Sequence, residues 1–519
     1  MKSAPGWIAR NSEIAVALIA TFIVVLVRLL IGRRVTFCGD PDSCSYLALG
    51  QSLSHHHGFV VNFLYQYQFI SLHLPSHGIE YWRPGVSLLL LMTQPFGGVT
   101  LASSIVVTTL AGVGFAWGAW KIAMDFSGNR GLACASYLLC LVLPQLWSGS
   151  LGPDSTLFYG AFVAWFLALF TVRFQSYLFD ILALVCVAAV NLIRNDAILL
   201  LAPLLVVLWL RRRSGQEKGS SVKYACVMIV GYLLARIPMV LIAHFVGGSM
   251  SRTQSLHLLY LTDLSELIRY HEPSTLHTML AAGFTKLIKL RITTAPLILY
   301  RMIFIEIGFA VVFLFPLRLR RRENQPVSLP ELAGGASFAL AVLTVYGLAL
   351  PAIGIFSALR SLSGVLPLIS VLIVLGIYRE SSVATARKLI AAVVLFYAIA
   401  GAMDDSRGVK KDNEIGNQDR LVAGYLASHG ILPGDKSLIM TSDPAQFSET
   451  TGYSSIPLPS NGLGATQSVA RDLAPTHVLL HRDDGSRSAE TEMIAALKPS
   501  NVADVPGTEM VVLTLSGER

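Results

Sequence analysis

The sequence is poor in charged residues. Only 14% of its 519 residues are Asp, Glu, Lys or Arg, whereas 53% are hydrophobic and the mean hydropathy is +0.59. Soluble globular chains carry about 25% charged residues, so this composition indicates a polytopic membrane protein. The net charge of +8 does not indicate nucleic-acid binding, because the basic residues form short runs beside apolar segments, such as Arg211 to Arg213. Such runs are typical of topology signals.

Several other signatures are missing. The tail from about residue 404 has no phosphate-binding loop, no Gly-x-Gly-x-x-Gly and no metal-finger spacing, which leaves its role open. No internal repeat with Gly- or Pro-broken helices in matching positions is present, and this absence speaks against a secondary transporter. The first apolar stretch is not followed by a small-residue cleavage site, so it is expected to remain as a membrane span.

Cysteine is also scarce, with six residues in the chain. Four of them lie inside apolar segments and are expected to be small core residues: Cys134, Cys140, Cys186 and Cys226. Cys38 and Cys44 differ because they flank an acidic sequence in the first loop between spans. A disulfide between them is allowed if that loop is extracytoplasmic.

Apolar runs long enough to cross a bilayer predict about eleven spans. They fall near residues 14–32, 99–121, 131–148, 155–173, 177–193, 197–211, 222–246, 294–317, 331–351, 362–379 and 386–403. A cytoplasmic N-terminus puts most of the clustered Lys and Arg on the cytoplasmic side, as the positive-inside rule requires. An odd number of spans then places the C-terminal tail outside the cytoplasm.

This topology predicts a transmembrane domain over residues 1–403 and a small soluble α/β domain over 404–519. Two outer loops are large, about 33–98 and 247–293. In the first loop, residues 42–53 have helical periodicity, and the apolar run 86–95 is too short to cross and suits an interfacial helix. The fold class is therefore a mostly α polytopic membrane protein with a C-terminal α/β domain.

Three acids lie on the predicted outer side. Asp40 and Asp42 follow the first span in Cys38-Gly-Asp-Pro-Asp-Ser-Cys44, and Asp154 follows the third span. Group transfer to a hydroxyl requires a carboxylate that removes the proton, and a second acid can orient the acceptor or hold a divalent cation such as Mg²⁺ or Mn²⁺. Asp42 and Asp154 are the candidate metal ligands. Each acid has a structural alternative, since Asp-Pro-Asp and Pro-Asp-Ser also cap helices or form Asx turns.

Arg83, Arg194 and Arg360 lie at the outer ends of apolar segments. A guanidinium group at this depth suits the phosphate of a lipid-linked substrate. The alternative is that each arginine snorkels or anchors the topology. The run His55 to His57 is expected to be a surface loop, because adjacent side chains point in different directions and do not converge on one metal.

These motifs resemble the GT-C superfamily of membrane glycosyltransferases. The resemblance rests on Gly39-Asp-Pro-Asp-Ser43 with Tyr46, on Tyr81-Trp-Arg-Pro84, on Asp154 in the second outer loop, on Arg194-Asn-Asp196, and on the late segment from Ser357 to Pro367. Protein O-mannosyltransferases and lipid A aminoarabinose transferases have the most similar layout. Asp42-Ser43 replaces the Asp-Glu pair of the mannosyltransferases and no MIR-type module is present, which argues against protein O-mannosylation.

The resemblance implies a role for each matching residue. Asp42 matches the catalytic acid, with Asp40 in reserve, and Asp154 matches the second acid. Arg83 matches a basic residue near the donor phosphate. Tyr46 and Tyr81 belong to the same motifs and are expected to contact substrate.

We therefore predict an inverting hexosyl- or pentosyltransferase of a bacterial cytoplasmic membrane. It would take one sugar from a polyprenyl-phosphate donor, amid membrane lipids, to a cell-envelope acceptor on the outer face. Two alternatives remain: a flippase for lipid-linked sugars, which would carry charges near the bilayer midplane, and a non-catalytic scaffold that presents the C-terminal domain.

Overall fold

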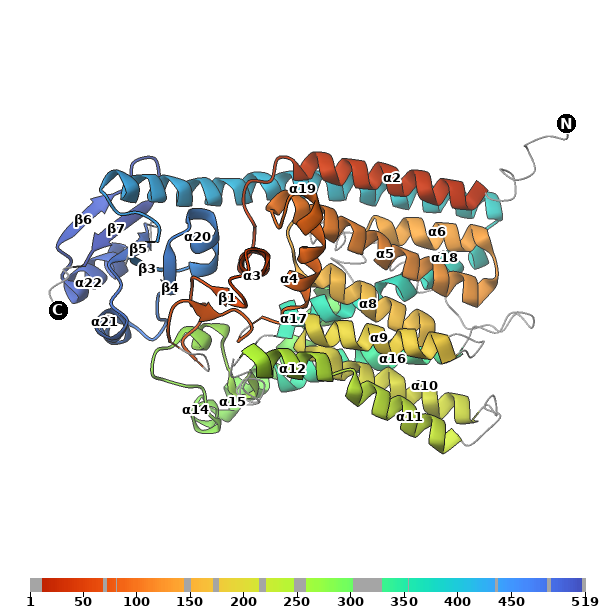
Figure 1. Ribbon diagram of the computed structural model, residues 1–519. Helices are drawn as coiled ribbons and strands as arrows, with labels where there is room; N and C mark the ends of the chain where they lie inside the picture. Colours follow the sequence, from red (N-terminus) through yellow and green to blue (C-terminus); the bar gives the residue numbers. More distant parts are fainter. Residues whose placement is uncertain are drawn as a thin grey trace. The chain divides into compact units, whose positions relative to one another are not determined.

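The computed structural model describes residues 12–68, 72–80, 82–143, 151–170, 177–213, 221–246, 258–301, 329–352, 354–434, 437–482 and 487–515 (Figure 1). The chain forms two compact units that do not follow its linear order. Unit 1 comprises Met1–Arg33, Ile105–Ile242 and Arg291–Arg407, and unit 2 comprises Arg34–Ser104, Ala243–Leu290 and Gly408–Arg519. The two large predicted loops thus belong to the same unit as the C-terminal tail.

Unit 1 is a bundle of apolar helices. Its described helices are α2 (Ser12–Gly32), α5 (Leu101–Ser127), α6 (Arg130–Leu141), α8 (Ser155–Phe170), α9 (Tyr177–Ile193), η2 (Asn195–Leu200), α10 (Leu201–Arg213), α11 (Ser221–Leu234), α12 (Ile237–Val246), α15 (Phe284–Arg301, which begins in unit 2), α16 (Leu329–Thr344), η7 (Val345–Ala349), α17 (Gly354–Leu362), η8 (Ser363–Val365) and α18 (Leu366–Glu380). Helices α8 and α9 run side by side, and α6 lies beside α18 (Figure 1).

These helices fall where the apolar runs predicted spans. Within the described residues, six helices are long and apolar enough to cross a membrane, and four shorter apolar helices accompany them. Residues 302–317 of the predicted span 294–317 lie outside the described residues. Helix α2 exposes large apolar side chains such as Ile19 and Phe22, as expected of a surface that faces lipid, whereas α8 is buried along nearly its whole length. A mostly α polytopic membrane fold is confirmed.

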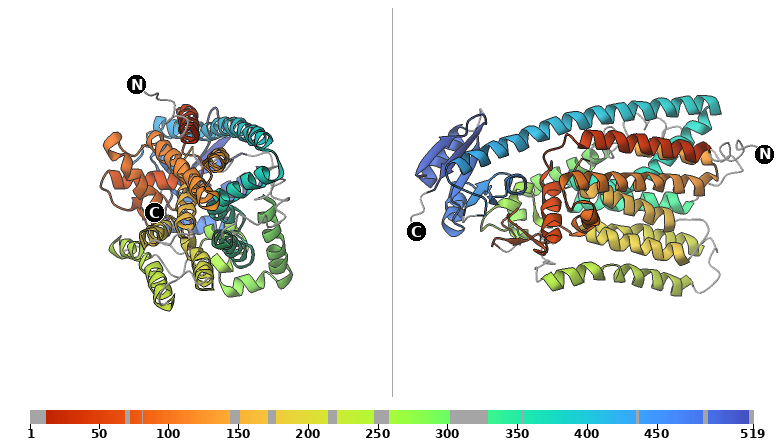
Figure 2. Two further views of the ribbon diagram at one scale, coloured as in Figure 1. Left: turned by 90° about the vertical axis from the view of Figure 1, so that its right-hand side faces the viewer. Right: turned by 45° about the horizontal axis from the view of Figure 1, so that its top comes forward.

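Helix α19 (Val383–Ser428) continues from one unit into the other as a single helix (Figures 1 and 2). Its 46 residues span about 69 Å, roughly twice the thickness of a bilayer core. The apolar first half is long enough to cross a membrane, and the charged second half belongs to unit 2. The predicted domain boundary at residue 403 therefore lies inside this helix.

The first loop of unit 2 is ordered around short helices. It contains α3 (Pro41–Ser54), α4 (Gly85–Leu90) and η1 (Leu91–Phe96), together with a two-stranded ladder of β1 (Val60–Val61) and β2 (Ser76–His77). Helix α3 lies where the sequence predicted a helix over 42–53, and α4 with η1 occupies the predicted interfacial run. The second loop adds η3 (Leu258–Tyr260), η4 (Leu264–Ile268) and α14 (Leu276–Ala281).

The tail folds into a five-stranded sheet with the order β4-β3-β5-β7-β6. Strands β4 (Ser454–Pro457), β3 (Leu438–Thr441) and β5 (His477–His481) are parallel, whereas β7 (Met510–Thr514) and β6 (Asn501–Asp504) join antiparallel. Helices α20 (Pro444–Thr451), α21 (Leu463–Asp472) and α22 (Arg487–Leu497) connect them. The predicted small C-terminal α/β fold is confirmed; β4, β6 and α20 had not been predicted.

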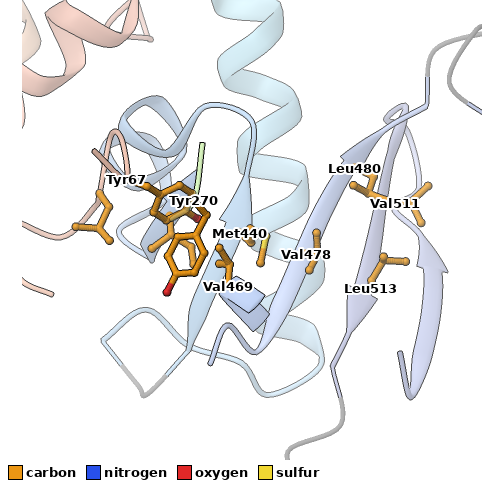
Figure 3. Packing of buried hydrophobic residues seen from close by; sticks show 10 residues of the cluster. Tyr67, Tyr270, Met440, Val469, Val478, Leu480, Val511 and Leu513 are labelled. Carbon is orange, nitrogen blue, oxygen red and sulfur yellow. The ribbon is translucent and has the colours of Figure 1, made fainter. Parts of the chain in front are cut away.

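The core of this sheet includes residues from both large loops. Tyr67 of the first loop and Tyr270 of the second meet edge to face, with ring centroids 5.0 Å apart, beside Met440 and Val469 (Figure 3). The first loop also extends the sheet, because Leu64 N–H donates to the Ser455 carbonyl over 2.9 Å. The tail and the loops therefore share one hydrophobic core.

Candidate active site

Asp154 lies in the turn before α8, within reach of two arginines of unit 1. Its carboxylate is 4.0 Å from Nε of Arg360, and it accepts a 2.5 Å hydrogen bond from the Thr156 hydroxyl. Burial raises the pKa of the Asp154 carboxyl, but the charges of Arg360 and Arg194 and the bond from Thr156 outweigh that effect, so its pKa lies below the ordinary value. Asp154 is therefore an anion matched to cationic neighbours.

Arg194 is fixed by a second acid. Its Nε donates to both oxygens of Asp196 over 3.2 Å, and Nη1 donates to the Ser155 hydroxyl over 3.4 Å. Asp196 is 6% exposed and also accepts hydrogen bonds from the hydroxyls of Tyr346, over 3.0 Å, and Ser361. Tyr346 lies in a π-helical turn, η7, a form that often marks functional sites. A carboxylate with so many donors holds its arginine in one orientation.

Small residues let α17 and η8 approach α8 closely enough to bring Arg360 to Asp154. A Cβ built on Gly160 would lie 2.7 Å from the Ser363 hydroxyl oxygen and 3.1 Å from the Phe115 ring. Ser363 also bonds to the Arg360 carbonyl over 2.6 Å. The ion pair thus depends on a helix approach that a larger side chain at residue 160 would prevent.

Asp40 and Asp42 have different surroundings at the start of α3 in unit 2. Asp40 is the N-cap residue: its Oδ1 accepts from the backbone N–H groups of Asp42 and Ser43 over 2.9 and 3.1 Å. The capping alternative considered for this pair thus describes Asp40. Asp42 stands one residue beyond Pro41 in the first helical turn, where the helix dipole favours a negative charge.

Asp42 is oriented by an aromatic residue. The indole Nε1 of Trp82 donates to Oδ1 of Asp42 over 2.8 Å. Cys38 and Cys44 form a disulfide, with their Cα atoms 5.1 Å apart, that closes the loop on which both acids stand. The disulfide that the sequence analysis considered between these two cysteines is therefore present in the structure.

The other predicted residues of unit 2 are placed as follows. Tyr46 is buried in α3, and its carbonyl accepts from the Ser87 hydroxyl over 2.9 Å. Arg83 is half-buried before α4, whereas Tyr81 lies outside the described residues. His55 to His57 form an exposed turn after α3, and no group of three His, Cys, Asp or Glu in the described chain could hold a metal ion.

Helix α3 is supported by the C-terminal domain. Gln446 of α20 donates to the Gly39 carbonyl over 2.6 Å, and Gln51 of α3 donates to Glu449 over 3.2 Å. Burial raises the pKa of Glu449 to about 8, so this carboxyl is neutral at pH 7. The tail therefore braces the segment that carries Asp42.

Within unit 1 the structure groups Asp154, Arg194 and Arg360, and within unit 2 it joins Asp42 to the first-loop aromatics. A convergence of Asp42 with Asp154 involves both units and stays a prediction. The sequence analysis did not assign roles to Trp82 or Asp196. Both stand next to or near assigned residues, in Tyr81-Trp-Arg-Pro84 and Arg194-Asn-Asp196. No sequence signal marks Tyr346 or Ser361 as partners of Asp196.

Solved structures of two other proteins have a similar fold. The structure is similar to that of ArnT from Cupriavidus metallidurans bound to undecaprenyl phosphate, with a TM-score of 0.57, 12% sequence identity and 99% of each chain covered. The apo form of the same protein gives a TM-score of 0.56 with 12% identity and 98% of each chain covered.

A third similar structure is the apo oligosaccharyltransferase of Archaeoglobus fulgidus. It has a TM-score of 0.51 and 13% identity over 92% of this chain and 70% of that chain. No protein-family model and no curated protein sequence matches the chain. The shared feature is therefore the fold.

Proposed function

We propose that this protein is an inverting glycosyltransferase that moves one sugar from a polyprenyl-phosphate donor to a hydroxyl of a cell-envelope acceptor. The observation that carries the proposal is the pairing of Arg360 with Asp154, near enough to Arg194 for its charge to lower the pKa of Asp154, in a chain with the GT-C fold. The undecaprenyl phosphate bound to ArnT of similar fold supports a lipid phosphate as the donor's leaving group. The reaction takes place at the outer face of a bacterial cytoplasmic membrane, with the N-terminus inside.

Asp42 is the general base in this proposal. It takes the proton of the acceptor hydroxyl while the hydroxyl oxygen attacks C1 of the donor sugar from the side opposite the phosphate. The bond between C1 and the phosphate oxygen breaks, and its electron pair stays on the phosphate. The bond from Trp82 holds the carboxylate in one orientation, so less freedom is lost when the acceptor binds.

Arg360 neutralises the charge that develops on the departing phosphate. It is the more accessible of the two arginines, with 29% of its side chain exposed against 13% for Arg194, and its 4.0 Å contact with Asp154 is loose. Arg194 is held by Asp196 and provides a fixed positive charge. Asp154 keeps Arg360 in place until the donor arrives, and Arg83 is the corresponding cation that the sequence resemblance suggests for unit 2.

The arginines also affect whether Asp154 can bind the divalent cation that the sequence analysis considered. Two guanidinium groups repel a divalent cation from Asp154, and one oxygen of Asp42 is occupied by an indole N–H. Neither acid, within its own unit, fits a metal centre, so no step of the proposed reaction passes through a metal. Dialysis of the enzyme against a chelator is expected to leave its activity within about twofold.

The proposal is tested with the purified full-length protein in lipid nanodiscs and a series of polyprenyl-phosphate sugars. Asp42→Asn and Asp154→Asn should each abolish transfer while the protein still expresses and folds. Full activity in both variants would overturn the mechanism. A flippase would move a fluorescent lipid-linked sugar across vesicles without transfer, and a scaffold would be indifferent to both substitutions.

A further inference from the structure

Residues 34–39, between α2 and the N-cap of α3, form neither a helix nor a strand. They lead directly into the first turn of α3, which carries Asp42. Backbone groups outside regular secondary structure need other hydrogen-bond partners. Here the carbonyls of Arg34, Thr36 and Gly39 accept hydrogen bonds from side chains of α19 and α20. The segment before Asp42 is therefore held by the C-terminal part of the chain.

One face of α19 provides most of these contacts. Asn413 Oδ1 accepts from the backbone N–H of Thr36 over 2.8 Å and from its hydroxyl over 2.9 Å, and Nδ2 donates to the Arg34 carbonyl over 2.6 Å. Two helical turns later, Arg420 donates through Nη2 to the Thr36 carbonyl and through Nη1 to Asn417 over 2.8 Å. The two residues grip the segment from both sides of Thr36.

Gly416 lies between Asn413 and Arg420 on the same face of the helix. A Cβ on Gly416 would come within 2.8 Å of Cβ and Cδ2 of Phe37 and within 2.9 Å of its Cγ. Phe37 is 2% exposed, so its ring is buried where α19 passes. Gly408 and Gly424 of the same helix meet nothing within 4 Å, so the close approach is particular to residue 416.

The disulfide connects this held segment to α3. Cys38 follows Phe37 and is bonded to Cys44, which stands two residues after Asp42. Gln446 of α20 donates to the carbonyl of Gly39, between Cys38 and the N-cap. Because the link is covalent, a fixed Cys38 limits how far the start of α3 can shift.

Resting on the proposed function, we propose that Asn413, Gly416 and Arg420 are positioning residues of the sugar-transfer reaction. They act through Asp42, by fixing the backbone from which its carboxylate meets the acceptor hydroxyl. A general base has to come within about 2.6–3.2 Å of the oxygen whose proton it removes. A displacement of about 1 Å can cost about 100-fold in rate, so a base at the end of an irregular segment requires such support.

The first test is amide hydrogen exchange in the full-length protein in nanodiscs, which needs no substrate. The backbone N–H groups of residues 42–44 bond to the side chain or carbonyl of Asp40, so they report on the first turn of α3. Asn413→Ala should speed their exchange about tenfold, because local opening of the turn becomes easier. Unchanged exchange in this variant would overturn the inference.

The second test is transfer from the polyprenyl-phosphate sugar that the wild type uses, with kcat counted per undecaprenyl phosphate site so that unfolded protein does not lower it. Asn413→Ala, Gly416→Ala and Arg420→Ala should each lower kcat about 10- to 100-fold, with the donor KM within about twofold of the wild type. A merely structural role would lower the melting temperature and leave this kcat unchanged.

The matched control is Gly424→Ala in the same helix. A Cβ there meets nothing within 4 Å, and Ala favours a helix over Gly, so kcat and hydrogen exchange should match the wild type. Equal losses of kcat in Gly424→Ala and Gly416→Ala would overturn the inference, because any added methyl group on α19 would then have the same effect.

A second-site change tests the contact between Gly416 and Phe37. Phe37→Ala removes the ring atoms that a Cβ on residue 416 would meet. The double variant Gly416→Ala/Phe37→Ala should therefore lose less kcat than the product of the two single losses. Losses that multiply would show that the two residues act independently and would overturn the role of Gly416.

Asp42→Asn separates this inference from the proposed function. If Asp42→Asn is inactive while Asn413→Ala and Gly416→Ala keep the wild-type kcat, the positioning role is wrong and the base stands. If Asp42→Asn keeps full transfer while Asn413→Ala still speeds exchange in the first turn of α3, the proposed base is wrong and the hold of α19 on this turn stands.

Discussion

The two units handle their acids in opposite ways. In unit 1, Asp154 is held among guanidinium groups and hydroxyls, which keep it ionised and bind it to its neighbours. In unit 2, Asp42 accepts a hydrogen bond from an indole N–H, on a loop closed by a disulfide. A carboxylate paired with cations is suited to holding them in place, whereas one that a neutral N–H orients is suited to removing a proton. In the proposed reaction, Asp154 with its arginines forms the phosphate half and Asp42 forms the acceptor half.

The largest effect should come from the acceptor half. Asp42→Asn is expected to lower transfer by about 100- to 10,000-fold, the range for loss of a general base, while undecaprenyl phosphate still binds. Asp40→Asn is the matched control, because Asn caps a helix as well as Asp and should keep α3 intact. Equal losses of activity in the two variants would contradict the assignment of Asp42, rather than Asp40, as the base.

In the phosphate half, Arg360→Ala should lower the affinity for undecaprenyl phosphate by about 10- to 100-fold, the value of a charge-assisted hydrogen bond. Arg360→Lys should recover part of the affinity, since the charge remains but the planar fork is lost. Arg212→Ala, an exposed arginine at the end of α10, serves as the control. If this control weakens binding as much, the loss reflects overall charge and not the site.

Asp196 gives a sharper test of how the phosphate half is built. Asp196→Asn should lower undecaprenyl phosphate affinity about tenfold, because Arg194 loses its partner and its orientation. Tyr346→Phe removes only one of the donors to Asp196 and should cost less than Asp196→Asn. A purely structural role would lower the melting temperature in both variants and leave the affinity of the folded protein unchanged, so affinity and melting are measured together.

How much of this contrast could be predicted from the sequence differs between the halves. Asp154, Arg194 and Arg360 all follow or precede apolar runs on one predicted side, so counting spans was enough to group them. The partners of Asp196 could not be predicted, because Tyr346 and Ser361 reach it only through the packing of α17 and η7. Trp82 was visible as an aromatic beside Arg83, but its bond to Asp42 depends on how the loop folds back onto α3.

The same limit applies to the fold. Periodic apolar runs predicted the helices because each span carries its own hydrophobic signal. The β-bridge between Phe63 and Ser455 has no such signal in the sequence, since it joins segments that are distant in sequence by backbone hydrogen bonds alone. Sequence analysis therefore assigned the tail and the first loop to different domains, whereas in the structure both belong to unit 2.

A substitution at Gly160 tests whether the close contact of α8 with η8 positions Arg360. Gly160→Ala should push Ser363 away and lower transfer about tenfold or more, because small displacements of positioning groups are costly. Gly114→Ala is the matched control: it lies in α5 of the same unit, and a Cβ there meets nothing within 4 Å. The control should be neutral or slightly stabilising, since Ala favours a helix over Gly. Similar losses in both variants would show that the approach at residue 160 is not specific.

The smallest effect concerns Glu449, the carboxyl of the C-terminal domain that contacts Gln51 of α3. Glu449 has its pKa raised from 4.5 to about 8, so between these values the folded protein holds a proton that the unfolded chain has released. Stability should therefore fall as the pH rises from about 4.5 to about 8 and then level off. Glu449→Gln carries no such proton, so its melting temperature should exceed that of the wild type by about 2–4 °C at pH 8 and by less at pH 5. Glu492→Gln on the exposed face of α22 should show no such pH dependence. If Glu449→Gln follows the wild type at every pH, Glu449 is ionised in the folded protein at neutral pH, and the two halves differ less in their use of charge than the structure indicates.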